Sequence, residues 1–137
     1  MRPFGFSHFV HPKQAAKVNE LVCSHILKEV AIMTQIIELR SYQLAPGTEK
    51  YFHQLMCEQA LPLLAAAGVC IELAQPSLHS PDHYILIRSY KNLAHRQSSQ
   101  DAFYGSAAWR QGPRDAIIAC VTSSNDIIVD ADFLGKM

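Results

Sequence analysis

Alternation of apolar and polar residues predicts strands at four places in the chain. Residues 34–44, TQIIELRSYQL, are rich in β-forming residues and alternate with a period of two. Residues 83–90, HYILIRSY, repeat that alternation. Two shorter apolar runs, 69–73 and 126–130, have the length and composition of further strands.

Apolar residues at helical spacing predict helices between these strands. After the turn APGT, Thr48 is a candidate N-cap, and the helical spacing continues to Gly68, a candidate C-terminal cap. Pro62 lies inside this span and predicts a bend, because proline removes a backbone hydrogen bond. Asn92 is a second candidate N-cap and opens a polar helix over residues 93–103.

A third helical stretch begins at Ser106 and carries Trp109 and Ile117 on one face. Gly112 and Pro113 are expected to kink or divide it. The resulting order, β-α-β-β-α-β, is the ferredoxin-like pattern, in which right-handed crossovers place both helices on one face of an antiparallel sheet. We therefore expect an α+β fold with one face of the sheet left bare.

The alternation in the two long strands gives the sheet two different faces. The aliphatic positions suit the side covered by helices: Ile37, Leu39, Ile85 and Ile87. The bare side would then carry a mixed set: Glu38, Arg40, Tyr42, Leu86, Arg88 and Tyr90. Such a face is too apolar for water and holds both signs of charge, so we expect a homodimer formed by sheet-to-sheet packing.

Composition narrows the possible partners. The chain has 137 residues, enough for one domain, and its 12 Lys and Arg residues balance 12 Asp and Glu residues. No strong field therefore attracts nucleic acid or an anionic membrane. No apolar run approaches the roughly 18 residues of a membrane-spanning helix. We expect neither nucleic acid nor a membrane as a partner.

The cysteines indicate a cellular compartment. Cys23, Cys57, Cys70 and Cys120 lie far apart, with no C-x-x-C pair. This spacing favours buried thiols over disulfides, and a cytoplasmic location follows as the expectation.

Residues 1–32 form an expected extension before a main domain over 33–137. From Pro12 onward, apolar residues at helical spacing predict an amphipathic helix. Three interpretations stay open for this extension. It is a helix that packs on the domain or on a partner, it is untranslated sequence before a natural start at Met33, or it is an organelle-targeting segment, which two glutamates disfavour.

Residues 35–129 resemble the NIPSNAP family of the dimeric α+β barrel superfamily. The resemblance is carried by IIELRSYQLAPGT, by the helix containing EQALPLL, by HYILIRSY and by the helix beginning SAAW. Its most specific piece is E-L-R-x-Y-x-L-x-P-G: Glu38, Leu39, Arg40, Tyr42, Leu44, Pro46 and Gly47. The sequence departs from the family at Gly112, where bulky residues are usual after the tryptophan, so a pocket lined by that helix would differ in shape.

The resemblance implies a ferredoxin-like protomer whose sheet pairs with a second copy to form a barrel with the helices outside. It implies no established reaction. The wider superfamily includes cofactor-free monooxygenases, isomerases and haem-handling proteins, and eukaryotic members of the family have been linked to mitochondria and protein interaction. Likeness of fold is a weak argument for chemistry.

The leading candidate site combines Glu38, Arg40 and Tyr42 with Arg88 and Tyr90. Residues two apart on a strand project to the same side, so these side chains can converge. An arginine pair can hold a carboxylate or enolate, with a tyrosine hydroxyl as donor or proton relay. The alternative, which has the stronger case, is an ion-pair network within the dimer interface.

The histidines offer weaker candidates. His79 and His83 are four apart, but Pro81 between them argues against a helix and hence against a metal pair. Asp82 beside His83 suits either an oriented general base or a solvated turn. His53 is either a ligand contact at the boundary of helix and sheet or an ordinary exposed histidine.

Two further residues complete the candidates. The favoured interpretation of Trp109 is a residue of the hydrophobic core, and the alternative is a residue that lines a flat aromatic pocket. Cys57 has His53 one helical turn before it, so a nucleophilic thiolate is conceivable. The chain lacks nucleotide-binding and hydrolase motifs such as G-x-G-x-x-G and G-x-S-x-G.

The leading prediction is a homodimer with a pocket between sheet and helices that binds or transforms a small organic molecule without metal or cofactor. As an enzyme it would be a cofactor-independent monooxygenase or isomerase. The expected catalytic residues are Arg40, Tyr42, His83 and Arg88. The expected ligand-binding residues are Glu38, Tyr90, Trp109 and His53. The alternative is a non-catalytic protein-interaction module.

Overall fold

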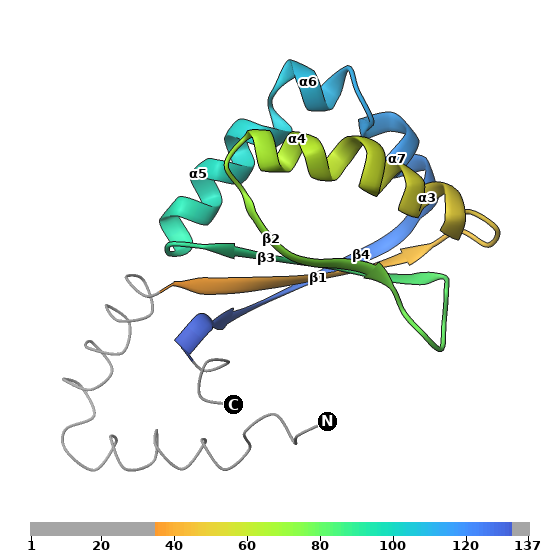
Figure 1. The fold of residues 1–137 in the computed structure, drawn as a ribbon, viewed down its shortest axis with the longest axis horizontal. Coiled ribbons are helices and arrows are strands. Elements are labelled where there is room, and N and C mark those ends of the chain that lie inside the picture. The colour runs from red at the N-terminus through yellow and green to blue at the C-terminus, as the bar shows by residue number, and fades with distance from the viewer. Residues whose placement is uncertain (1–34, 133–137) are drawn as a thin grey trace, which may run out of the picture.

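The computed structural model describes residues 35–132, which form a four-stranded antiparallel sheet with helices on one face (Figure 1). The strands are β1 (Ile36–Leu44), β2 (Cys70–Pro76), β3 (His83–Tyr90) and β4 (Val121–Asp130). Their order in the sheet is β2-β3-β1-β4. The extension predicted over residues 1–32 lies outside the described residues.

The helical layer comes from the two crossover connections. The first contains α3 (Glu49–Leu55), the π-helical turn η2 (Met56–Ala60) and α4 (Leu61–Ala66). The second contains α5 (Leu93–Tyr104), α6 (Ala107–Arg110) and α7 (Arg114–Cys120). Both lie over the same face of the sheet (Figure 1). The predicted ferredoxin-like α+β fold is confirmed.

Local capping residues behave largely as their chemistry predicts. Gly68 takes a φ of 84°, and the amides of Gly68 and Val69 donate to the carbonyls of Ala65 and Leu64, each at 3.0 Å. This pattern is a Schellman cap, which needs a residue that tolerates positive φ. Asn92 also caps as predicted, since its Oδ1 accepts from the His95 amide at 2.8 Å.

The first helical connection differs from prediction at its start and centre. The Thr48 hydroxyl does not cap α3, because it donates to the carbonyl oxygen of Ala45 at 2.7 Å. Pro62 is the second residue of α4 and lies two positions after the end of η2, so the irregularity predicted at this proline takes the form of a wider turn just before it. A π turn suits this place because proline lacks the amide hydrogen that a regular α-helix requires.

The face assignment from the sequence is wrong. The residues buried beneath the helices on β1 and β3 are the mixed set: Ile36, Glu38, Leu44, Tyr84, Leu86, Arg88 and Tyr90. Leu39 pairs with Ile87 and Ile127 on the opposite face, where Ile37 and Ile85 also lie. Alternation with period two shows that two faces differ but not which is covered, and here the helices supply polar partners for the buried charges.

The last strand is longer than predicted. β4 begins at Val121, directly after α7, whereas the apolar run predicts a start at Asp126. Apart from Val121, the missed segment VTSSN is polar and exposed, but its backbone pairs with β1 along most of its length. A strand at the edge of a sheet can be polar because solvent reaches it, so hydrophobicity alone does not find it.

The cysteine expectation holds only in part. Cys57, Cys70 and Cys120 are free thiols, but only Cys120 is buried, and Cys57 and Cys70 are exposed. Within residues 35–132, no helix is both long enough and apolar enough to cross a membrane.

Gly112 and Pro113 separate α6 from α7, as predicted, and the glycine leaves no room for a side chain. A Cβ at position 112 would lie 2.4 Å from the Ala108 carbonyl oxygen, a backbone atom that cannot rotate away. We expect Gly112→Ala to lower the free energy of unfolding by about 1–3 kcal/mol in urea denaturation. Gln111→Ala, at the exposed neighbouring position, should change it by less than about 0.5 kcal/mol. Equal effects of the two variants would contradict the close approach.

Candidate functional site

Glu38 lies at the centre of a buried ionic network between the sheet and α5. Its side chain has no exposed area. It accepts hydrogen bonds from Arg88 Nε at 3.0 Å, from Arg96 Nε at 2.6 Å and from Gln100 Nε2 at 2.9 Å. Arg88 comes from β3, whereas Arg96 and Gln100 stand one turn apart on α5. One carboxylate therefore ties two strands to a helix.

Tyr104, at the end of α5, extends the network. Its hydroxyl accepts a hydrogen bond from Arg88 Nη1 at 2.8 Å and a longer one from Arg40 Nη1 at 3.4 Å. Arg88, like Glu38, has no exposed area. The Tyr104 oxygen thus bridges two guanidinium groups from neighbouring strands.

Arg40 joins the network to the edge strand β4. Its Nε and Nη2 donate to the two carboxylate oxygens of Asp126 at 2.6 and 2.8 Å, a bidentate pair across the β1–β4 ladder. Arg96 Nη2 also approaches Asp126, at 3.5 Å. The conformation of Arg40 is therefore fixed by Asp126 on β4 and by the Tyr104 hydroxyl on α5.

The network keeps both of its carboxylates ionised. Burial acts to raise the pKa of Glu38, but Arg88 and the hydrogen bonds from Gln100 and Arg96 hold that pKa below its ordinary value. Hydrogen bonding from Arg40 lowers the pKa of Asp126. The guanidinium groups of Arg40, Arg88 and Arg96 thus face two carboxylates, which leaves one positive charge in excess.

A cleft of about 540 Å³ borders this network, between the sheet and the second helical connection. Arg40, Tyr42, Tyr104 and Arg114 give it cationic and phenolic groups. Its apolar wall includes Trp109, Ile117, Ile118 and Val121. A volume of this size, with apolar walls and a few polar groups, is typical of small-molecule sites.

Tyr42 supplies a neutral hydroxyl to the cleft. Burial, reinforced by the neighbouring Tyr104, raises the pKa of Tyr42 to about 12. The phenol therefore stays protonated at neutral pH and acts as a hydrogen-bond donor. The Tyr42 ring is held by the Phe52 ring of α3, with 5.5 Å between centroids.

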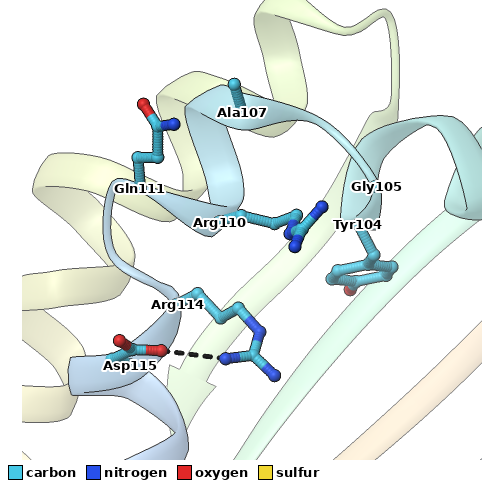
Figure 2. A pocket seen from close by; sticks show the side chains of 7 residues that line it. All are labelled: Tyr104, Gly105, Ala107, Arg110, Gln111, Arg114 and Asp115. Carbon is cyan, nitrogen blue, oxygen red and sulfur yellow. Dashed lines mark hydrogen bonds and ion pairs between the residues drawn. The ribbon is translucent and has the colours of Figure 1, made fainter.

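A second cavity of about 630 Å³ adjoins the first, since Tyr104 and Arg114 line both. Figure 2 shows Arg110 and Arg114 with their guanidinium groups on the same side as the Tyr104 ring. Arg114 Nη1 donates to Asp115 Oδ1 at 2.9 Å, and Arg110 forms no ion pair with any residue of 35–132. Sequence analysis missed both arginines, whose spacing of four residues is interrupted by the turn at Gly112 and Pro113.

The structure brings together only some of the predicted site residues. Arg40 and Tyr42 line the cleft, and Glu38 and Arg88 are buried beside it. Tyr90 joins the network, because its hydroxyl accepts from Gln100 Nε2 at 3.1 Å, but it does not line the cleft.

His83 lies on the opposite face of the sheet. It pairs with Gln43 in the ladder and is five residues from Arg88, so the strand period of two places the two side chains on different faces. Its Nδ1 is 3.3 Å from Asp82 Oδ1, and both side chains are partly exposed. The expected convergence of His83 with the arginines and tyrosines is therefore wrong.

His53 lies at the boundary of helix and sheet. Its Nδ1 is 2.7 Å from the hydroxyl of Tyr84, which is buried, and its Nε2 is 3.6 Å from Cys57 Sγ. Burial raises the pKa of Tyr84, so the phenol stays protonated, and the tautomer of the imidazole decides which of the two groups donates. Neither His53 nor Cys57 lines the two cavities described above.

Trp109 fits both interpretations of its role. It is 8% exposed and packs against Phe103 and Tyr104, with ring centroids 5.4 and 5.3 Å away. It also forms part of the wall of the 540 Å³ cleft.

Within residues 35–132, no group of three or more His, Cys, Asp or Glu side chains is placed to hold a metal ion.

No family model and no curated protein matches the chain. Among solved structures, an uncharacterized NIPSNAP-like domain protein from Burkholderia xenovorans is similar, with a TM-score of 0.66 at 16% identity over 71% of this chain and 84% of that one. A NIPSNAP family protein from Agrobacterium tumefaciens has a TM-score of 0.65 at 18% identity over 69% of this chain and 90% of that one. The chain has the NIPSNAP fold.

A solved structure that is not described as a NIPSNAP protein also shares this fold. A Nitrosomonas europaea protein provisionally described as an antibiotic biosynthesis monooxygenase is similar, with a TM-score of 0.57 at 12% identity over 71% of this chain and 89% of that one. Identities this low show a common fold alone. In this chain the NIPSNAP-like motif E-L-R-x-Y supplies Glu38 and Arg40 to the network and Tyr42 to the cleft.

The network makes stability depend on pH. The pKa values of Glu38 and Asp126 are lowered in the folded state, so the unfolded chain binds protons first as the pH falls. Their contribution is present above the unfolded values near 4 and is lost below them. We expect Glu38→Gln to destabilise the protein by about 3–5 kcal/mol at pH 7, because Arg88 is left buried without its charge partner.

Urea denaturation at pH 7, 4 and 3 measures this effect. The stability difference between the parent and Glu38→Gln should stay nearly constant down to about pH 4 and shrink between pH 4 and pH 3, below the unfolded pKa. Glu58→Gln, at an exposed position on η2, should follow the parent at every pH. A constant difference between the parent and Glu38→Gln would contradict the assignment.

Proposed function

We propose that the 540 Å³ cleft binds a small organic molecule. The observation that carries the proposal is the set of groups meeting there: the hydroxyl-bearing Tyr42 and Tyr104, the cations Arg40 and Arg114, and the aromatic Trp109. The buried network beneath them holds Arg40 and Tyr104 in place before any ligand arrives. Such preorganisation lowers the cost of ordering side chains on binding.

The cleft is rich in donors and poor in bases. Asp126 is engaged by Arg40, and Glu38 is both fully buried and saturated with hydrogen bonds. Tyr42 can donate a proton or a hydrogen bond, whereas no unpaired carboxylate lines this cleft among residues 35–132. The site therefore suits a ligand whose own oxygen becomes negative, such as an enolate or phenolate.

These groups favour chemistry in which the substrate supplies the reactive carbanion. A substrate that loses its proton to solvent would be held as its anion by Arg40 and Tyr42. In isomerisation, Tyr42 would donate its proton to the carbanionic carbon of that anion and take up a new proton from solvent. In a cofactor-independent oxygenation the same stabilised anion would react with dioxygen, which is the oxidant and supplies the oxygen atoms. The fold shared with the protein from Nitrosomonas europaea supports testing oxygenation beside isomerisation.

We also propose that a second copy of the chain covers the bare face of the sheet. That face carries aliphatic side chains in its centre: Ile37, Leu39, Ile85, Ile87 and Ile127. Ile127 is 63% exposed, and none of the helices from α3 to α7 lies over this side (Figure 1). An uncharged aliphatic centre is complementary to itself, which is what a two-fold contact requires.

Ligand binding is tested by screening a small-molecule library and then comparing variants on the strongest ligand. Tyr42→Phe should weaken binding by roughly tenfold, because the ligand loses a donor inside a cleft from which water is displaced. Tyr51→Phe, on an exposed ring of α3, should leave the dissociation constant unchanged. A library that yields no ligand, or a ligand equally affected by both variants, would count against the cleft.

The assembly is tested by sedimentation velocity at micromolar concentration. The parent should sediment as a dimer. Ile127→Lys should raise the dimer dissociation constant by at least roughly tenfold, since it buries an unpaired charge in the contact. Leu78→Lys, at a residue that is 98% exposed between β2 and β3, should have no effect. A monomeric parent would exclude this assembly.

A further inference from the structure

We infer that Arg110 and Arg114 hold the charged end of the ligand, and that the ligand is an amphipathic organic anion. It would carry a carboxylate or phosphate at one end and a flat apolar body at the other. This inference rests on the proposed function, because the apolar body would occupy the 540 Å³ cleft.

The two arginines are placed to act on one group. Both line the 630 Å³ cavity together with Tyr104. Arg110 lies at the end of α6 and Arg114 at the start of α7, and in Figure 2 both side chains extend into the space beside the Tyr104 ring. Guanidinium groups bind carboxylate and phosphate oxygens with paired N–H donors.

Their donors are available, unlike those of the arginines below. Arg40 and Arg88 already donate most of their N–H groups to Asp126, Glu38 and Tyr104, and Arg40 keeps only its remaining Nη hydrogens for a ligand in the cleft. Arg110 has no ion-pair partner among residues 35–132. Within the described part of the chain, Arg114 pairs only with Asp115, whose side chain is 85% exposed. An ion pair so exposed contributes little, so an incoming anion can replace it.

The adjoining cavities fix the direction of the ligand. Tyr104 and Arg114 line both, so a molecule held at Arg114 reaches directly into the cleft with Trp109 and Ile118. The excess positive charge of the buried network adds to the attraction for an anion. Asp115 is the one carboxylate among the described residues that line the outer cavity, and it opposes that attraction.

A matched probe set tests the charge requirement. 2-Naphthoate, 2-naphthyl phosphate and neutral 2-naphthol share one ring system and differ in the head group. Dissociation constants are measured by calorimetry on the full chain. Trp109 is the single tryptophan, so quenching of its fluorescence reports occupation of the cleft. We expect at least one anion to bind roughly tenfold more tightly than 2-naphthol.

Substitutions then locate the charge contact. Arg110→Gln and Arg114→Gln should each remove most of the advantage of the anion over 2-naphthol. Arg110→Gln, at a residue that does not line the cleft, should leave 2-naphthol binding unchanged. Asp115→Asn should strengthen anion binding by roughly two- to fivefold, because it removes a competing carboxylate. Lys50→Gln removes an exposed charge on α3, outside both cavities, and should change nothing.

The outcomes separate this inference from the proposed function. Equal affinity for all three probes would overturn the anion site and leave the cleft standing. An anion advantage that survives in both arginine variants would also overturn it. If none of the three probes binds, the anion site is overturned as well. The proposed function is overturned only if the library screen also yields no ligand. Of the two anions, the tighter one identifies the head group.

Discussion

The position of the helical layer depends on one buried carboxylate. Glu38 cannot remain charged beneath α5 without the guanidinium and amide groups that surround it, and each of these comes from an element that must dock for the contact to form. An apolar core tolerates small shifts in packing, whereas a saturated ionic core allows few. Glu38 therefore sets where α5 lies over the sheet, and with it the position of Tyr104 at the helix end.

Most of the architecture follows from the sequence because its signals are local. The period-two alternation, the cap at Asn92 and the glycine at position 68 each act within a few residues, and each is found where the pattern places it. The choice of covered face is not local. It depends on Arg96 and Gln100, which lie on a helix that has little apolar surface and instead presents polar groups to the sheet. The sequence predicts that the helix over residues 93–103 is polar and lies over the sheet. That combination indicates that charged side chains of the sheet, here Glu38 and Arg88, are buried beneath it.

The same distinction between local and long-range signals applies to the candidate site. Arg40 and Tyr42 lie two residues apart on one strand, so strand geometry places their side chains on the same face of the sheet. The same geometry places the His83 side chain on the opposite face. Arg110 and Arg114 could not be found in this way, because the break between α6 and α7 removes the periodicity that would relate them. Asp126 also escaped notice as a partner of Arg40, because the pairing of β1 with β4 joins residues far apart in the sequence.

The close contact at Gly112 has a consequence for molecular recognition. Because a Cβ on Gly112 would meet the Ala108 carbonyl oxygen, the turn between α6 and α7 has no space for a side chain at this position. A homologue with a bulkier residue there would have to open the turn and move its two flanking side chains apart. The residue at position 112 would thus set the distance between Arg110 and Arg114, and with it the size of the anionic group that fits between them. Related proteins could then differ in ligand specificity without any change in the residues that contact the ligand.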